Sequence, residues 1–226
     1  MTQDAIDLDA VAKPHKRGCP KSFAKLRALL AADLYRYAGR TGLGPFLKHV
    51  IFTPGFKCTV AMRTCGWLKT KPFLAFGLYP LSKAILLRLR HKYGIAIPEY
   101  TVVGPGLFIN RFSGIFVHGD AVLGSNVNMT HGTMLGQTNR GARAGAPTVG
   151  DRVFFGAGAK VIGAIRIGDD CAVGANAVVT KDVPDGGVVG GVPAKLLSTE
   201  GAGDYIRRRV PEDLMRKCGS PFIGEA

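Results

Sequence analysis

Residues 149–183 read VGDRVFFGAGAKVIGAIRIGDDCAVGANAVVTKDV, and an apolar residue recurs at every sixth position along them. A second apolar column follows the same period, four positions after each member of the first. A period of six fits neither an α-helix, with about 3.6 residues per turn, nor a single strand with its period of two. It predicts a parallel β-helix in which each hexapeptide forms one strand and turn and three hexapeptides complete a coil. The two columns are Val149, Phe155, Val161, Ile167, Val173 and Val179, and Val153, Ala159, Ile165, Cys171, Ala177 and Val183.

The same period extends toward the N-terminus, with one irregularity. Ile97, Val103, Ile109 and Ile115 are six residues apart, and the spacing then predicts a two-residue slip around residues 117–119. The register resumes at Leu123, and a polar, glycine-rich stretch at 137–147 is predicted to form a loop outside the coil. We expect the β-helix domain to cover residues 95–197. The last repeat should end near Pro184, with an irregular cap after it, because open strand edges invite aggregation.

The residues before the repeats have helical patterns. We predict helices at 22–38, from about 46, at about 59–69 and at roughly 74–93, and therefore an α-helical, basic region at 22–94. Residues 1–21 are polar and contain two prolines, which predicts disorder. Residues 198–226 are expected to form a tail with a short helix around 205–217.

The positive charge is concentrated in the N-terminal part. The net charge is +14, and residues 1–100 carry 17 Lys/Arg against 5 Asp/Glu. This is either a solvated basic face or a surface that attracts an anionic partner, such as a membrane or a diphosphate-linked substrate. Nucleic acid is disfavoured, because the basic region lacks aromatic platforms at a recognisable spacing.

The apolar stretches and the cysteines predict the compartment. The longest apolar stretch, roughly residues 72–87, is interrupted by Gly77, Pro80 and Lys83, and no signal-peptide pattern precedes it. The five cysteines are odd in number and form no CxxC pair, which favours a reducing compartment. We expect a cytoplasmic protein, with peripheral contact to the inner face of the membrane left open.

Two histidines lie within the repeats. If Ile109, Met129, Phe155 and Val173 face inward on one side, the residues two positions later form another column: Arg111, His131, Ala157 and Ala175. Coils stack about 4.8 Å apart, so Arg111 and His131 are predicted to be neighbours. Imidazole is largely neutral and basic near neutral pH, which makes His131 the strongest candidate general base, the alternative being a surface histidine. His118 lies at the predicted slip beside Asp120, and it is a second candidate base, a substrate contact or a turn residue.

Residues 94–197 resemble the serine acetyltransferase branch of the hexapeptide acyltransferases, through GAGAKVIG, VGANAVV, KDVP and GVPAK. The resemblance implies a left-handed β-helix, a homotrimer and acyl-CoA bound between adjacent coils, with no metal. It also implies that backbone groups hold the CoA and that a lysine meets its phosphates. The implied backbone positions are Gly136, Gly156, Ala157 and Ala175, and the candidate lysines are Lys160, Lys181 and Lys195.

Other residues depart from that branch. Its Asp-His pair, whose histidine is the base, is replaced here by Asn110-Arg111, and its Arg-His pair by Gly145-Ala146. Residues 128–141, NMTHGTMLGQTNRG, are more similar to polysaccharide O-acetyltransferases of the colanic-acid type. This similarity implies that the base has moved to His131. The candidate acceptor-binding residues are Asn110, Arg111, Asp120 and Arg140.

The predicted function is acetyl transfer from acetyl-CoA to a hydroxyl of a sugar or other small acceptor. The hydroxyl would attack directly in a ternary complex, with main-chain N–H groups stabilising the oxyanion. One alternative is L-serine as acceptor, and another is a non-catalytic scaffold subunit. A zinc carbonic anhydrase would need three histidine ligands, whereas only His118 and His131 lie in the predicted coil.

Overall fold

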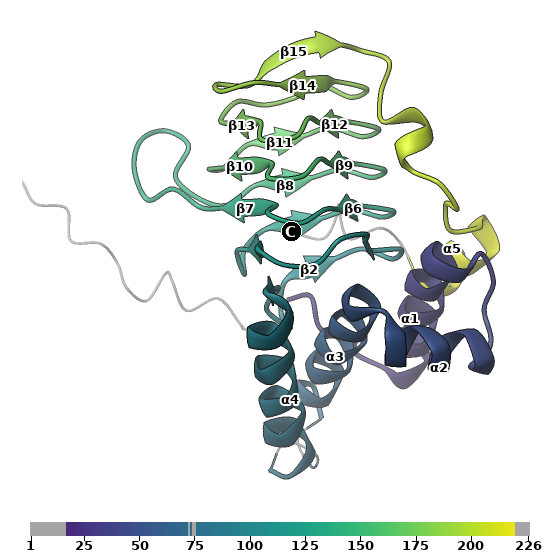
Figure 1. The fold of residues 1–226 in the computed structure, drawn as a ribbon. Coiled ribbons are helices and arrows are strands. Elements are labelled where there is room, and N and C mark those ends of the chain that lie inside the picture. The colour runs from purple at the N-terminus through teal and green to yellow at the C-terminus, as the bar shows by residue number, and fades with distance from the viewer. Residues whose placement is uncertain (1–16, 72, 74–75, 220–226) are drawn as a thin grey trace, which may run out of the picture.

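The computed structural model describes residues 17–71, 73 and 76–219, and it consists of a stacked coil of short strands with helices at one end (Figure 1). Of the segment predicted to be disordered, residues 1–16 lie outside the described part. Residues 17–20 follow the surface of the coil, where the Gly18 N–H donates to the Tyr100 carbonyl at 2.9 Å.

The strands form three parallel sheets, one for each face of the coil. Sheet A has the order β1-β4-β7-β10-β13, sheet B the order β11-β8-β5-β2, and sheet C the order β15-β14-β12-β9-β6-β3. Only the pairing of β14 with β15 is antiparallel among the described strands. The bounds are β1 Ile95–Ala96, β2 Val102–Val103, β3 Phe108–Ile109, β4 Ile115–Val117, β5 Val122–Leu123, β6 Asn128–Met129, β7 Met134–Gly136, β8 Thr148–Val149, β9 Phe154–Phe155, β10 Lys160–Ile162, β11 Arg166–Ile167, β12 Ala172–Val173, β13 Val178–Val179, β14 Val188–Gly190 and β15 Lys195–Ser198.

The register confirms that three hexapeptides make one coil. Phe155 pairs with Val173, 18 residues later, and both side chains are fully buried. The second predicted column is buried too, including Ala159 and Cys171. The repeat runs further than predicted, because β14 continues sheet C beyond Pro184 and places Val189 in the core. The two columns therefore form a continuous apolar interior.

The predicted position of the two-residue slip was wrong. Ile109 pairs with Met129, 20 residues later, whereas Val117 pairs with Leu135, 18 residues later. The two extra residues therefore lie between β3 and β4, at residues 110–113, and not at 117–119. Ile115 and Val117 both point inward from β4, so the spacing alone did not identify which of them continues the column.

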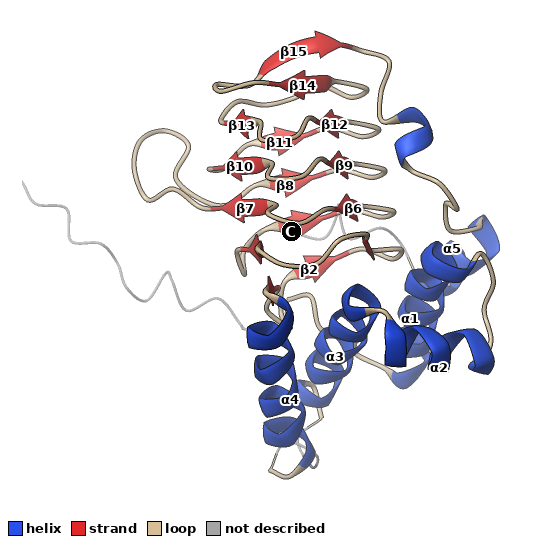
Figure 2. Ribbon diagram, in the orientation of Figure 1, coloured by secondary structure: helices blue, strands red, loops and turns tan. Residues whose placement is uncertain are grey.

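In the described part of the chain four α-helices precede the coil: α1 Phe23–Ala38, α2 Leu43–Phe52, α3 Pro54–Lys69 and α4 Leu78–Tyr93. The Ser22 hydroxyl caps α1 by accepting the Lys25 N–H at 3.1 Å. α3 begins five residues earlier than predicted, because Pro54 is its first residue rather than a break. The helices gather beyond one end of the coil (Figure 2).

The helical region completes the open edge of the first coil with side chains. Asp33 of α1 is fully buried and accepts the N–H groups of residues 106–107 at 2.9 Å each. Arg63 of α3 donates to the carbonyls of residues 103–104 at 3.1 and 2.7 Å, and it also forms an ion pair with Asp33. These contacts replace the hydrogen bonds that another coil would supply at this edge.

The C-terminal strap, residues 199–219, runs back along the outside of sheet C (Figure 1). The ring of Tyr205 stacks on Phe154 with centroids 4.5 Å apart, and its carbonyl accepts the Asn128 amide at 2.7 Å. A short 3₁₀ turn, Gly203–Tyr205, lies in this segment, and α5, Glu212–Cys218, packs on α1. The short helix predicted around 205–217 is therefore shorter, since α5 begins only at Glu212. Along the described residues, no helix is both long enough and apolar enough to cross a membrane.

Candidate active site

The predicted site residues lie at two corners of the coil. The C–A corner is the turn from sheet C to sheet A, and the A–B corner is the turn from sheet A to sheet B. The C–A corner comprises residues 110–114, 130–133, 156–159 and 174–177, and the A–B corner comprises residues 118–121, 137–147, 163–165 and 180–182.

Hydrogen bonds between coils fix the register at the C–A corner. The Gly158 N–H donates to the His131 carbonyl at 2.9 Å, and the Asn176 N–H donates to the Ala157 carbonyl at 2.7 Å. His131, Ala157 and Ala175 therefore lie in line, as the spacing predicted. The prediction that Arg111 is the neighbour of His131 on the coil below was wrong. The Gly132 N–H donates to the carbonyl of Ser113, which aligns Ser113 with His131.

The residue in line with His131 on the coil below is Ser113. It was missed because the slip was placed after β4, at 117–119, and not between β3 and β4. The slip corresponds to the eight-residue spacing between Ile109 and Val117, but the sequence offers the same spacing between Ile115 and Leu123. Ser113 has a φ of 92°, an unusual conformation for a residue with a side chain, which the two-residue insertion imposes on the turn.

The His131 imidazole is exposed, and it makes no hydrogen bond to any described residue. It is followed by Gly132, whose φ of 73° brings its backbone close to that of Gly158. A Cβ on Gly132 would lie 3.1 Å from the Gly158 Cα, so the glycines allow the turns to stack tightly beneath the histidine. The histidine therefore projects from a closely packed, small-residue wall.

The backbone next to His131 has free hydrogen-bonding capacity. Within the part of the chain that the structure describes, the N–H groups of Ala157 and Ala175 have no partner. Ala175 is exposed and Ala157 is partly exposed, and both side chains are single methyl groups. Donors of this kind beside an imidazole can bind the carbonyl or amide oxygens of a ligand. Gly156, by contrast, uses its N–H within sheet C, on the Val173 carbonyl at 2.8 Å.

Three further predicted residues lie at or near this corner. Asn110 and Arg111 are exposed in the two-residue insertion, one coil below His131. Lys160 begins β10, and its ammonium donates to the Gly132 carbonyl, so it supports the corner itself. Lys195 is exposed at the end of the coil, opposite Gly190.

The remaining predicted residues lie at the A–B corner, at the other end of the strands of sheet A. His118 accepts the Asp120 N–H on Nδ1 at 3.2 Å, and the Asp120 carboxylate is 3.9 Å from the same nitrogen. Its N–H donates to the Leu135 carbonyl at 2.8 Å, which places it in register with Gly136. Asp120 thus closes a turn around His118, and neither residue approaches His131.

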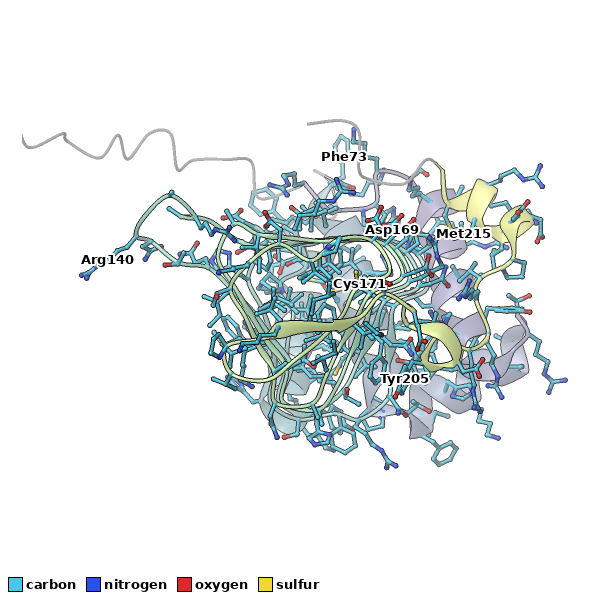
Figure 3. The ribbon with its side chains drawn as sticks, turned by 90° about the horizontal axis from the view of Figure 1, so that it is seen from above. Phe73, Arg140, Asp169, Cys171, Tyr205 and Met215 are labelled. Carbon is cyan, nitrogen blue, oxygen red and sulfur yellow. The ribbon has the colours of Figure 1, made fainter. Side chains whose placement is uncertain are left out.

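The loop predicted at 137–147 leaves the coil at this A–B corner. Thr138 and Gly145 pair across its base, and Arg143 donates to the Thr180 carbonyl at 3.1 Å. Arg140 projects from its tip, away from the coil (Figure 3). Lys181 is exposed beside the base of the loop. Within one chain, His131 is therefore separate from His118, Asp120, Gly136, Arg140 and Lys181.

The stacked hexapeptide coils point to the hexapeptide-repeat transferases. Residues 146–181 match the family model described as "Bacterial transferase hexapeptide (six repeats)". The serine acetyltransferase of Mycobacterium tuberculosis is 36% identical over 169 residues, covering 74% of this chain and 72% of that protein. The serine acetyltransferase of Helicobacter pylori strain J99 is 35% identical over 151 residues, covering 67% of this chain and 85% of that protein. The chain belongs to the serine acetyltransferase family, and it is an acetyl-CoA-dependent O-acyltransferase.

Solved structures agree with this assignment. The Neisseria gonorrhoeae serine acetyltransferase in complex with serine is 31% identical, with a TM-score of 0.64 over 78% of this chain and 71% of that one. The Brucella abortus enzyme in complex with coenzyme A is 29% identical, with a TM-score of 0.61 over 76% of this chain and 66% of that one. These relatives are serine acetyltransferases, so the predicted assignment to the polysaccharide O-acetyltransferases is not supported.

Proposed function

We propose that this protein transfers an acetyl group from acetyl-CoA to the hydroxyl of L-serine, with His131 as general base. The observation that supports this site is the exposed His131 imidazole in line with the unpaired N–H groups of Ala157 and Ala175. The names of the relatives support the acceptor, as does the serine bound to the Neisseria gonorrhoeae enzyme.

In this proposal the serine hydroxyl oxygen forms a bond to the thioester carbonyl carbon while His131 accepts the hydroxyl proton. The carbon–sulfur bond then breaks, and His131 returns the proton to the leaving thiolate. A backbone N–H group at the C–A corner stabilises the oxyanion of the tetrahedral intermediate. Within the described chain all five cysteines are buried and no serine hydroxyl makes a hydrogen bond to a histidine, which favours direct attack.

Among the predicted contacts with acyl-CoA, we favour those that have free hydrogen-bonding groups at the C–A corner. Ala157 and Ala175 have free N–H groups that fit the amide oxygens of the pantetheine arm. Lys195 lies at the coil end near the same corner, and we assign it to the CoA phosphates in preference to Lys160, whose ammonium bonds to Gly132. Lys181 lies at the A–B corner, so it would reach the same ligand only from another subunit.

We infer from family membership that the coil is left-handed and that three chains form a homotrimer. A trimer of triangular coils can place the A–B corner of one subunit beside the C–A corner of the next. Such an arrangement would bring His118, Gly136 and Arg140 near a partner's His131, although they are separate within one chain. Arg111, exposed one coil below His131, is our candidate for the acceptor carboxylate.

The function is tested by free-thiol release from acetyl-CoA with L-serine, homoserine, nucleotide sugars and oligosaccharides. We expect turnover with L-serine and a decrease in kcat of about 10²- to 10³-fold for His131→Ala. His91→Ala is the matched control, because it removes an exposed imidazole on α4, outside the coil. Arg111→Gln should raise KM for L-serine and leave KM for acetyl-CoA unchanged. Turnover with saccharides alone would refute the acceptor, and full activity of His131→Ala would refute the base.

The compartment is also a proposal. All five cysteines lie in the described part of the chain as buried, free thiols, which supports a reducing, cytoplasmic environment.

A further inference from the structure

Helix α2 exposes its apolar residues to solvent. It buries none of its ten residues, and the exposed fractions are 74% for Leu43, 49% for Leu47, 58% for Ile51 and 76% for Phe52. Residues 43, 47 and 51 are about one helical turn apart, so they form a continuous stripe along one side. An unburied stripe of this kind is typical of a surface that contacts something else.

The surface around α2 is positively charged. Residues 17–93 contain 15 Lys/Arg and a single acidic residue, Asp33. That carboxylate is fully buried against Arg63, so the solvent-facing surface of the described helices α1–α4 carries no negative charge. Lys48 on α2 and Arg40 just before it are both exposed beside the apolar stripe. α2 therefore combines aliphatic side chains with nearby cations.

A groove continues the apolar surface beneath α2. It lies between α1, α2 and α5, has a volume of about 790 Å³, and is lined mainly by alanine and leucine side chains. Leu43 and Phe46 contribute to it from α2, and its only charged lining residues in the described chain are Arg27 and Lys217. α5 also carries Glu212 and Asp213, but neither lines the groove.

The charges decide between the possible partners of this face. Two copies of the same basic surface would repel each other, which disfavours self-association through α2. A nucleic acid would pair with the cations but would leave the stripe of Leu43, Leu47 and Ile51 without apolar contacts. The surface of an anionic bilayer supplies both phosphate groups for the cations and an acyl region for the stripe.

We propose that α2 is a membrane-docking helix that lies in the headgroup region of an anionic bilayer. Leu43, Leu47, Ile51 and Phe52 enter the acyl boundary, while Arg40 and Lys48 contact lipid phosphates. α2 lies at the helical end of the molecule, beyond the stack of coils (Figure 1). The proposal does not depend on the identity of the acceptor.

Vesicle co-sedimentation tests this proposal with the full-length protein. Wild type should bind vesicles of phosphatidylglycerol and phosphatidylcholine, bind pure phosphatidylcholine weakly, and dissociate at high salt. The variant Leu47→Ser/Ile51→Ser should bind the anionic vesicles at least about tenfold more weakly. Lys48→Gln should weaken binding at low salt.

The matched control is Leu81→Ser/Ile85→Ser, which changes two similarly exposed residues, 59% and 49%, on α4. We expect this variant to bind vesicles like wild type. Thiol release from acetyl-CoA without vesicles should be the same in both double variants and in wild type, which separates this test from the test of the proposed function.

Three results would overturn the proposal. The first is wild type that does not bind anionic vesicles at low salt, and the second is an equal loss of binding in the α2 and α4 variants. The third is a smaller oligomer on size-exclusion chromatography for Leu47→Ser/Ile51→Ser, which would make the α2 face a contact between copies of this chain.

Discussion

Substituting Asp33 by leucine should destabilise the protein more than loss of an ordinary salt bridge. The carboxylate accepts hydrogen bonds from Arg63 and from the N–H groups of residues 106–107. Its removal leaves the Arg63 charge, 3% exposed, without a counterion, at a cost of about 3–5 kcal/mol. Two buried N–H groups also lose their acceptor, at about 1 kcal/mol each. These costs overlap, and we expect the free energy of unfolding to fall by about 5 kcal/mol.

The double variant Asp33→Leu/Arg63→Met reveals what the pair does. A buried ion pair that makes no other hydrogen bonds can often be replaced by apolar residues without loss of stability, or with a gain of about 1–4 kcal/mol. Here Arg63 also donates to the carbonyls of residues 103–104, so the double substitution leaves four backbone groups of the coil edge unsatisfied. At roughly 1 kcal/mol each, the variant should remain about 4 kcal/mol less stable than wild type.

Urea unfolding measures both values through the fluorescence of Trp67, the only tryptophan, which lies on α3. Protein concentration is held constant, because subunit association contributes to apparent stability. Arg152→Met is the control, since its pair with Asp170 is about one third exposed and should contribute less than about 1 kcal/mol. Recovery of the double variant to within about 1 kcal/mol of wild type would refute the role of the pair in completing the sheet edge.

Three further predictions concern pH, packing and thiols. Burial raises the pKa of Glu99, but its hydrogen bond with Lys83 and the nearby lysine charges outweigh this and hold the pKa at about 2. Its stabilisation is therefore present above the unfolded pKa of about 4.3 and lost as pH falls toward 2. In Glu99→Gln, acid unfolding monitored by circular dichroism should show a pH-dependent loss of stability that is smaller by about 3 kcal/mol. Gly132→Ala should lower Tm and kcat more than Gly141→Ala, which has a similar φ but no atom within 4 Å of the new Cβ, and equal effects would contradict the role of packing at the C–A corner. Because all five cysteines are buried, a thiol reagent should label none rapidly in the folded protein and five in urea, and fast labelling of any of them when folded would contradict the structure.

The sequence predicted the repeating part of the fold because packing against the coil interior imposes its period directly. The coil interior is the only apolar environment open to Phe155, Val173 and their equivalents. Each coil therefore needs an apolar residue at the same position. The position of the two-residue slip was not predictable in this way. A shift of two residues preserves the alternation of inward and outward side chains, so Ile115 and Val117 satisfy the pattern equally well. Only the pairing of β4 with β1 and β7 resolves the register.

The helical cap was predicted as helices but not as a cap. Asp33 and Arg63 look in sequence like ordinary charged residues of a helix surface. Their burial depends on the unpaired edge of the first coil, which lies 40 to 74 residues away in the chain. Interactions of this range leave no local pattern, so spacing could not have identified them.

The candidate site was predictable where the repeat is regular. His131, Ala157 and Ala175 belong to consecutive, evenly spaced coils, and their alignment follows from the period. The partner proposed below His131 depended on the slip, and Ser113 occupies that place instead of Arg111. The separation of the two corners also could not be deduced, since it requires knowing which hexapeptide forms which face.

The C-terminal strap imposes an order of events on protein synthesis. Its Tyr205 covers Phe154, a residue that leaves the ribosome about 50 positions earlier. At roughly 5–20 residues per second, the outer side of sheet C stays uncovered for about 3–10 s during translation. The partly made chain therefore presents an apolar strip that chaperones can recognise, and the final residues remove it when they dock.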